Sequence, residues 1–132
     1  MRVIVDTSVW SLALRRKEYK ETRETKILKK LLKDEEEVYL LGIILQKILQ
    51  GIKSKRQFKL LENYFNLFPI LTPEREDYII SAEMKNYCMQ QGIQVGTIDI
   101  LIAEMSLRYN CYLLTADKDF THIAKCINLK LL

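Results

Sequence analysis

Three aspartates lie where apolar segments end or begin, and their side chains are the ones that could do chemistry. Asp6 follows the apolar run 3–5, and Asp117 comes three residues after the apolar run 112–114 ends. Asp99 lies at the start of an apolar helical segment. Three carboxylates that converge repel one another unless a cation lies between them. Carboxylate oxygens suit Mg²⁺ or Mn²⁺, and such a site can activate water to cleave a phosphodiester bond.

Each aspartate also has a purely structural interpretation. Asp6 could be an N-cap or turn residue, although Thr7 or Ser8 can cap the following helix instead. Asp99 could bond the free N–H groups of the first helical turn. Its neighbours from 98 to 103 are all apolar, so we expect a largely buried helix start in which an ionised carboxylate needs compensation. Asp117 could be a turn residue, with Asp119 capping the helix that follows and supporting the site.

Short apolar runs alternate with helical stripes along the whole chain. This alternation predicts a parallel sheet with helices on both faces. In such sheets ligands bind beyond the carboxyl ends of the strands, where Asp6 and Asp117 lie. Pro69 places its strand at an edge. We expect strands at 3–5, 38–41, 68–71, 112–115 and 128–132, and helices at 8–15, at 20–33, after Gly42, from Ser54 to about Asn66, at 74–91, from Thr97 to about Tyr109, and after Asp119.

The bulk composition is that of an ordinary soluble globular protein. Of 132 residues, 48% are hydrophobic and 29% are charged, which predicts one domain over residues 1–132. Apolar runs are too short to cross a membrane, and Asp6 interrupts what would be the core of a secretory signal. We therefore expect a cytoplasmic protein. Cys88, Cys111 and Cys126 are widely spaced among apolar residues, so we expect reduced core thiols and neither a disulfide framework nor a zinc site.

Charge is distributed unevenly between the two halves. Residues 1–60 carry 15 Lys and Arg against 8 Asp and Glu, whereas residues 61–132 carry 6 against 9. The excess of positive charge indicates a polyanion partner for the first half. The alternative is a solvated helix face, because acids are interleaved with the basic residues over 15–33.

Three stretches together resemble the signature blocks of PIN-domain nucleases, and most of all the VapC toxins of toxin–antitoxin pairs. They are Val3–Ser8, Gly96–Ala103 and Leu114–Phe120, in the family's order and over essentially the whole chain. The resemblance implies a PIN-like three-layer α/β sandwich with a five-stranded parallel sheet. It also implies an Mg²⁺- or Mn²⁺-dependent endoribonuclease, a homodimer, and neutralisation by a small VapB-like antitoxin. Asp6, Asp99 and Asp117 match the family's metal-coordinating acids, with Thr7, Thr115 and Asp119 as supporting residues.

One position departs from the family pattern. The family usually has a Glu in a Glu-x-x-x-Gly context after the second strand, and here Lys47 precedes Gly51 at that spacing. An ammonium group facing the carboxylates could pair with Asp6 or Asp99 and take the cation's place. We therefore expect weak metal binding and a weakened or inactive enzyme. The alternative is that Lys47 turns to solvent and water replaces the missing carboxylate.

Two rival functions follow from the same residues. The first is a catalytically dead PIN fold that binds RNA or a protein, which Lys47 favours and the three retained acids disfavour. The second is a phosphoacceptor receiver domain, which needs an acid at the end of its central strand. The middle strands here end in Leu41-Gly42 and Ile70-Leu71, so this second rival is disfavoured.

Overall fold

The sheet is parallel, and its most buried strand comes first in the chain. The computed structural model describes residues 1–14 and 20–132. In this part of the chain four strands pair in the order β3-β2-β1-β4, and Val3, Ile4 and Val5 of β1 are fully buried. Apolar residues on both faces are what a central parallel strand requires. The strands are β1 (Arg2–Val5), β2 (Glu37–Leu41), β3 (Ile70–Leu71) and β4 (Tyr112–Leu114).

The expected strand at 128–132 is not formed, so the prediction of five strands is wrong for the described residues. Leu113 donates its N–H to the Lys130 carbonyl, and Leu132 donates to the Leu113 carbonyl, each at 2.9 Å. These two bonds make one isolated bridge between Leu113 and Leu131. Pairing stops there because the Leu129 N–H bonds back to the Ile127 carbonyl at 2.7 Å, which curls the chain away from an extended run.

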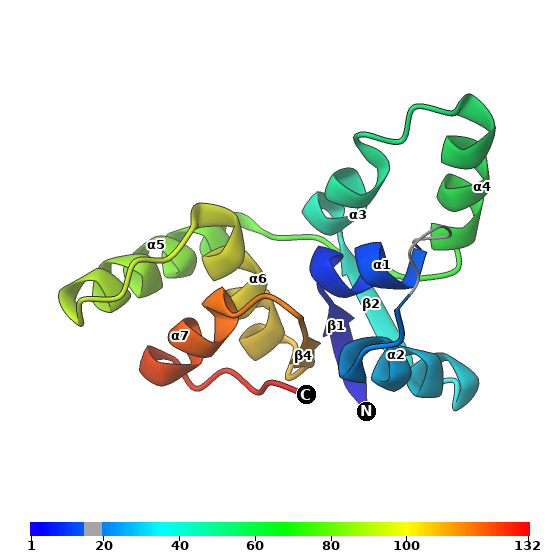
Figure 1. Cartoon of the computed structure of the whole chain (residues 1–132). Coiled ribbons are helices and arrows are strands. Elements are labelled where there is room, and N and C mark those ends of the chain that lie inside the picture. The colour runs from blue at the N-terminus through cyan, green and yellow to red at the C-terminus, as the bar shows by residue number, and fades with distance from the viewer. Residues whose placement is uncertain (15–19) are drawn as a thin grey trace.

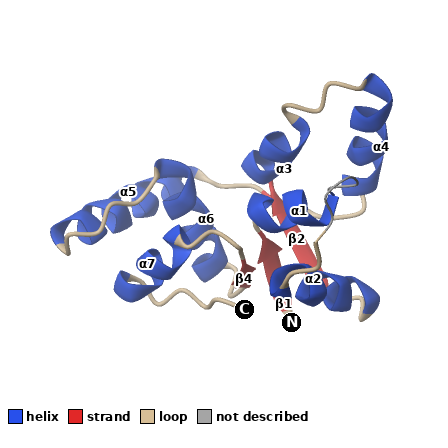
Figure 2. Ribbon diagram, viewed as in Figure 1, coloured by secondary structure: helices blue, strands red, loops and turns tan. Residues whose placement is uncertain are grey.

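The helices form two groups with the strands between them (Figures 1 and 2). Helices α5, α6 and α7 contact one another on one side, and α1 to α4 lie on the other. The three-layer α/β prediction is confirmed. No helix in the described ranges is long and apolar enough to cross a membrane. The helices are α1 (Thr7–Leu14), α2 (Arg23–Lys33), α3 (Gly42–Leu49), α4 (Lys55–Phe65), α5 (Arg75–Gln90), α6 (Thr97–Arg108) and α7 (Asp119–Cys126).

Helix α2 starts three residues later than expected, because Thr22 is its N-cap and exchanges hydrogen bonds with Thr25. Glu21 pairs with Lys29 at 3.6 Å, and Glu24 with its neighbour Arg23 at 3.7 Å. These half-exposed pairs are those of a solvated helix face. The remainder of the basic stretch, residues 15–19, lies outside the described residues, as does the last position of the helix expected at 8–15.

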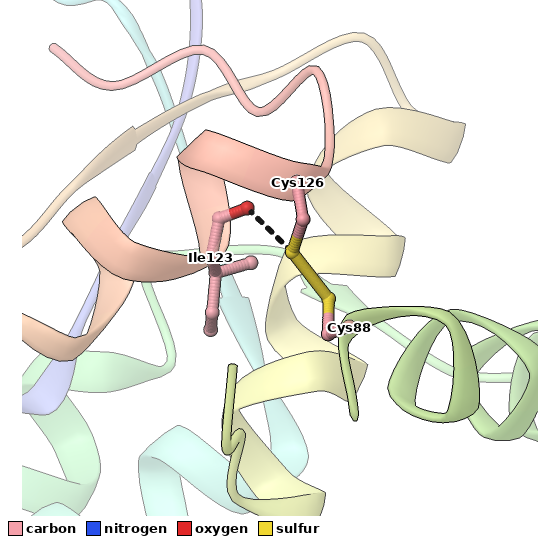
Figure 3. The surroundings of a disulfide bond; sticks show 3 residues. All are labelled: Cys88, Ile123 and Cys126. Carbon is pink, nitrogen blue, oxygen red and sulfur yellow. Dashed lines mark hydrogen bonds between the residues drawn. A yellow bond between two sulfur atoms is a disulfide. The ribbon is translucent and has the colours of Figure 1, made fainter. Parts of the chain in front are cut away.

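The prediction of three reduced core thiols is wrong for two of them. Cys88 and Cys126 form a disulfide between the last turn of α5 and the end of α7 (Figure 3). Their partnership could not be inferred from sequence, because their sequence separation is 38 and only the packing of α5 against α7 brings them together. Cys111 is the free, buried thiol that was expected.

A buried group of charges joins α5 to α6. Asp77, 1% exposed, accepts hydrogen bonds from the Glu74 N–H at 2.7 Å and from the Arg108 guanidinium. Arg108 also pairs with Glu74 at 3.3 Å. Glu104 is 3% exposed beside them. The pKa of Glu104 is raised to about 7, and burial is the largest cause. The charge of Asp77 and a hydrogen bond to Asp77 raise it further, whereas the charge of Arg108 lowers it.

Replacing Glu104 by Gln is expected to remove a pH-dependent loss of stability. An unfolded Glu titrates near pH 4.5, so between about 4.5 and 7 the folded state holds the extra proton. The contribution of Glu104 is therefore most favourable at low pH, and on the order of 3 kcal/mol is lost as the pH rises through 7. The Gln side chain stays neutral, so Glu104→Gln should be more stable than the parent at pH 8 by urea denaturation.

The matched control is Glu83→Gln on the exposed face of α5, which should not change stability at either pH. Equal destabilisation by Glu104→Gln at pH 5 and pH 8 would contradict the assignment, since loss of packing does not depend on pH.

Candidate metal centre

The register between β1 and β4 places Asp6 beside the loop that carries Asp117. Val5 pairs with Leu114, and the Asp6 N–H donates to the Leu114 carbonyl at 2.9 Å. Helix α1 begins at the next residue, and the Ser8 N–H donates to Asp6 Oδ2 at 3.4 Å. Asp6 itself therefore stands at the N-cap position, and the prediction that Thr7 or Ser8 caps this helix is wrong. Its capping role and its place at the sheet edge are compatible.

Two hydroxyl groups hold one oxygen of Asp6. Ser8 Oγ donates to Asp6 Oδ2 at 2.7 Å, and Thr115 Oγ1 donates to the same atom at 3.1 Å. Ser8 Oγ accepts the Ala116 N–H at 3.0 Å, and Thr115 Oγ1 accepts the Asp117 N–H at 3.0 Å. Asp6 is only 4% exposed, and no donor from the described part of the chain bonds its Oδ1. One oxygen is thus fixed and the other is left for a ligand.

Sequence reasoning chose Thr7 as a supporting residue, and the structure points to Ser8 instead. The Thr7 hydroxyl is buried, and no partner for it exists among residues 1–14 and 20–132. The signal that could have identified Ser8 is its spacing. Asp6 and Ser8 are two residues apart, as are Thr115 and Asp117, and side chains at this spacing commonly bond a neighbouring backbone N–H.

Asp99, Asp117 and Asp119 form a close acidic group. One carboxylate oxygen from each lies within 4.8 Å of the others. Asp119 was expected to cap α7, which is wrong: the helix begins at Asp119, and its N–H donates to Asp117 Oδ1 at 2.9 Å. Asp119 instead adds its own carboxylate to the group. The side chain of Asp99 lies over Gly96, where an added Cβ would be 3.6 Å from Asp99 Oδ2.

Asp99 experiences the charge of the whole site. Burial raises the pKa of the Asp99 carboxyl above its ordinary value, the charges of Asp117 and Asp6 raise it further, and Asp119 adds a smaller effect. Asp99 is half-buried and its neighbour Ile98 is 39% exposed, so the helix start is less enclosed than its apolar sequence predicted. An all-oxygen donor set with mutual repulsion is the kind that Mg²⁺ or Mn²⁺ fits.

Lys47 approaches this group from α3 without direct pairing. Its side chain is half-buried, and its positive charge lowers the pKa of Asp99, against the effect of the acids. Within the described ranges it makes no ion pair, so the expected contact with Asp6 or Asp99 is not formed. The alternative of a fully solvated lysine does not describe it either, because its charge still acts on Asp99.

A hollow of about 260 Å³ opens beside the loop that carries Asp117. Arg23 and Lys118 contribute positive charge to its walls, Glu24 adds a negative charge beside Arg23, and Thr115 and Asp117 lie on the side of the acidic group. Cationic groups next to carboxylates are suited to a substrate whose phosphates flank a metal-bound position.

Ser8→Ala is expected to destabilise the protein by about 1–2 kcal/mol, because the Ala116 N–H loses its acceptor and Asp6 Oδ2 its shortest donor. Urea denaturation measures this loss. Ser11→Ala, on the exposed face of the same helix, is the matched control and should change stability by less than about 0.5 kcal/mol. Equal stabilities of the two variants would show that the hydroxyl does not hold the strand ends together.

Comparison with known proteins supports this architecture. A chain in the crystal structure of VapBC2 from Rickettsia felis, bound to a DNA fragment from their promoter, has a TM-score of 0.77 at 22% identity, covering 100% of this chain and 98% of that one. FitAcB from Neisseria gonorrhoeae has a TM-score of 0.76 at 19% identity, with 98% and 96% covered. VapC20 from Mycobacterium tuberculosis, a Sarcin-Ricin loop cleaving toxin, has a TM-score of 0.65 at 13% identity, with 96% and 98% covered.

These identities are low, so the solved structures establish the fold alone. A search of curated protein sequences finds no significant match. The PIN domain family model matches residues 3–125, which is nearly the whole chain. On this match, the protein belongs to the PIN domain family.

Proposed function

We propose that the protein is a VapC-like endoribonuclease whose activity depends on Mg²⁺ or Mn²⁺ and is weakened by Lys47. The observation that carries this proposal is the convergence of acids from distant segments. Asp99 from α6 meets Asp117 and Asp119 within 4.8 Å, and Asp6 lies close enough to raise the pKa of Asp99. Outside a binding site, like charges gathered at a sheet edge would only destabilise the fold.

Asp6, Asp99 and Asp117 are the residues we assign to the metal, with Asp119 as a further oxygen donor. A bound divalent ion would supply an activated water and stabilise the leaving oxygen of a phosphodiester. Ser8 and Thr115 keep Asp6 Oδ2 in place, and Oδ1 is the oxygen that remains available to a ligand.

RNA is the substrate class that the surroundings favour. Lys118 lines the hollow next to Asp117, together with Arg23 and its partner Glu24, and the first half of the chain has an excess of positive charge. Such groups bind phosphates independently of sequence and so position a strand without reading it. The structural relative VapC20 is described as cleaving the Sarcin-Ricin loop, which is consistent with this assignment.

The partners and the localisation are proposed from the similarity to the solved structures. The relatives from Rickettsia felis and Neisseria gonorrhoeae were solved as VapBC2 and FitAcB. We propose that this chain likewise acts as a single PIN domain in the cytoplasm, forms a homodimer, and is neutralised by a small antitoxin.

A second candidate function is a PIN fold that binds RNA or a protein but does not cleave. The half-buried Lys47 favours it, because a positive charge near Asp99 lowers the affinity for a second cation there. Titration of Mn²⁺ by calorimetry separates the two functions. A pure binding module would show no Mn²⁺ binding with either Lys or Glu at position 47.

Lys47→Glu is expected to strengthen Mn²⁺ binding by roughly 10- to 100-fold and to produce cleavage of a structured RNA mixture in Mg²⁺ or Mn²⁺. The change removes a repelling cation and adds an oxygen ligand. The matched control is Lys53→Glu, which makes the same charge change at an exposed position beyond α3 and should leave metal binding as in the parent. Equal, metal-independent cleavage by the parent and Lys47→Glu would refute the proposal.

Asp99→Asn, made in the Lys47→Glu form, should lower metal-dependent cleavage by at least roughly 100-fold. The substitution removes a charged ligand at the centre of the acidic group. In the metal-free protein it should also raise the melting temperature, because it relieves repulsion from Asp117 and Asp6. Retained cleavage, or loss of activity accompanied by unfolding in circular dichroism, would show that Asp99 does not have the assigned role.

A further inference from the structure

The disulfide joins two helix ends that belong to different parts of the fold. Cys88 is fully buried in the last turn of α5, and Cys126, half-buried, is the last residue of α7 (Figure 3). Their Cα atoms are 6.0 Å apart, inside the range that natural disulfides span. The bond joins residues with a sequence separation of 38 and closes a loop that contains the whole of α6 and β4.

That loop contains every member of the close acidic group. Asp99 lies in the first turn of α6, and α6 packs along α5. Asp119 is the first residue of α7, the helix that Cys126 ends, and Asp117 lies two residues before it. The three carboxylates repel one another when no cation is bound, so the contacts of α7 with α5 and α6 must hold them together.

We propose that Cys88 and Cys126 are a redox-active pair, and that their bond keeps α7 against the α5–α6 hairpin so that Asp117 and Asp119 stay close to Asp99. Reduction allows α7 to move away from α5 and α6, and the three carboxylates of the acidic group can then move apart. The effect on metal binding rests on the proposed function, whereas the effect on α7 does not.

The step is thiol–disulfide exchange with a dithiol. A thiolate of the dithiol attacks Sγ of Cys126, the more exposed of the two residues, and the bond to Cys88 breaks. Cys88 leaves as a thiolate and takes up a proton. The second thiol of the reagent then displaces Cys126, which is protonated in turn. The protein gains two electrons and two thiols, and the dithiol becomes a cyclic disulfide. Oxidation by a small-molecule disulfide runs the same steps in reverse.

The fold already provides for the reduced state. Cys126 Sγ lies 3.4 Å from the carbonyl oxygen of Ile123, one turn earlier in α7 (Figure 3). In the disulfide this sulfur has no proton to donate. After reduction the new S–H group has an acceptor at that position without any movement of the helix. Both oxidation states of Cys126 are therefore accommodated, as a reversible exchange requires.

The test compares the full chain in its oxidised state and after dithiothreitol. Thiol titration of the unfolded protein should find one thiol before reduction, from Cys111, and three after it. Reduction should lower the melting temperature of the metal-free protein by about 5–10 °C. In the Lys47→Glu form, calorimetry should find Mn²⁺ binding at least roughly threefold weaker after reduction, because fewer molecules have the acids in place.

Two variants complete the design. Cys126→Ser should behave like the reduced parent and ignore dithiothreitol, and its Ser hydroxyl can donate to the Ile123 carbonyl as the thiol would. Cys111→Ser removes the unpaired thiol and should keep the full change in melting temperature on reduction. Should either variant fail to fold, the thiol count and the melting temperatures of the parent still test the proposal.

Three thiols in the air-oxidised protein, or identical melting temperatures in both redox states, would overturn the proposal. A fall in melting temperature with unchanged Mn²⁺ affinity would overturn the link to the acidic group. Absence of Mn²⁺ binding in both states would contradict the proposed function and that link together, while the melting temperatures would still test the hold on α7.

Discussion

The parallel pairing of β1 with β4 is the constraint on which the candidate site depends. Once Val5 is in register with Leu114, the Asp6 N–H donates to the Leu114 carbonyl, and β1 and β4 both end at the same edge of the sheet. The hydroxyls of Ser8 and Thr115 then meet over one oxygen of Asp6. Shifting the register by one residue would turn β1 over and bury its alternate side chains on the opposite face. The apolar core and the polar edge are therefore set by the same alignment.

Helix α6 connects that edge to the rest of the molecule. Its first turn presents Asp99 to the acidic group, and its middle carries Glu104 into the buried charges against α5. Both carboxyls have raised pKa values, and burial is the largest cause in each case. The helix can carry two such groups because its other face is strongly apolar, with Ile100, Ile102 and Met105 buried in the core. Favourable packing thus offsets an electrostatic cost at two points on one element.

The sequence was enough to predict the fold class, and it predicted Asp6 and Asp117 at one edge because strand ends in a parallel sheet share an edge. Among the described residues, however, the close acidic group consists of Asp99, Asp117 and Asp119, and Asp6 is outside it. It was not enough where the outcome depends on tertiary packing. The last strand is reduced to a bridge by the local bond between Leu129 and Ile127. Ser8 rather than Thr7 bonds Asp6: the spacing allows this bond, and the backbone at the start of α1 determines that it forms. The partnership of Cys88 with Cys126 depends on how two distant helix ends meet.

Lys47 has a consequence for how the chain persists in a cell. Its positive charge offsets part of the repulsion at Asp99 from within the protein. A fourth carboxylate at this position would instead add to the repulsion, so less stability is left for a bound cation to supply here than in a chain with that carboxylate. Proteases remove the unfolded fraction of any protein. By offsetting part of that repulsion, the lysine keeps more of the metal-free chain folded and so protected from proteolysis.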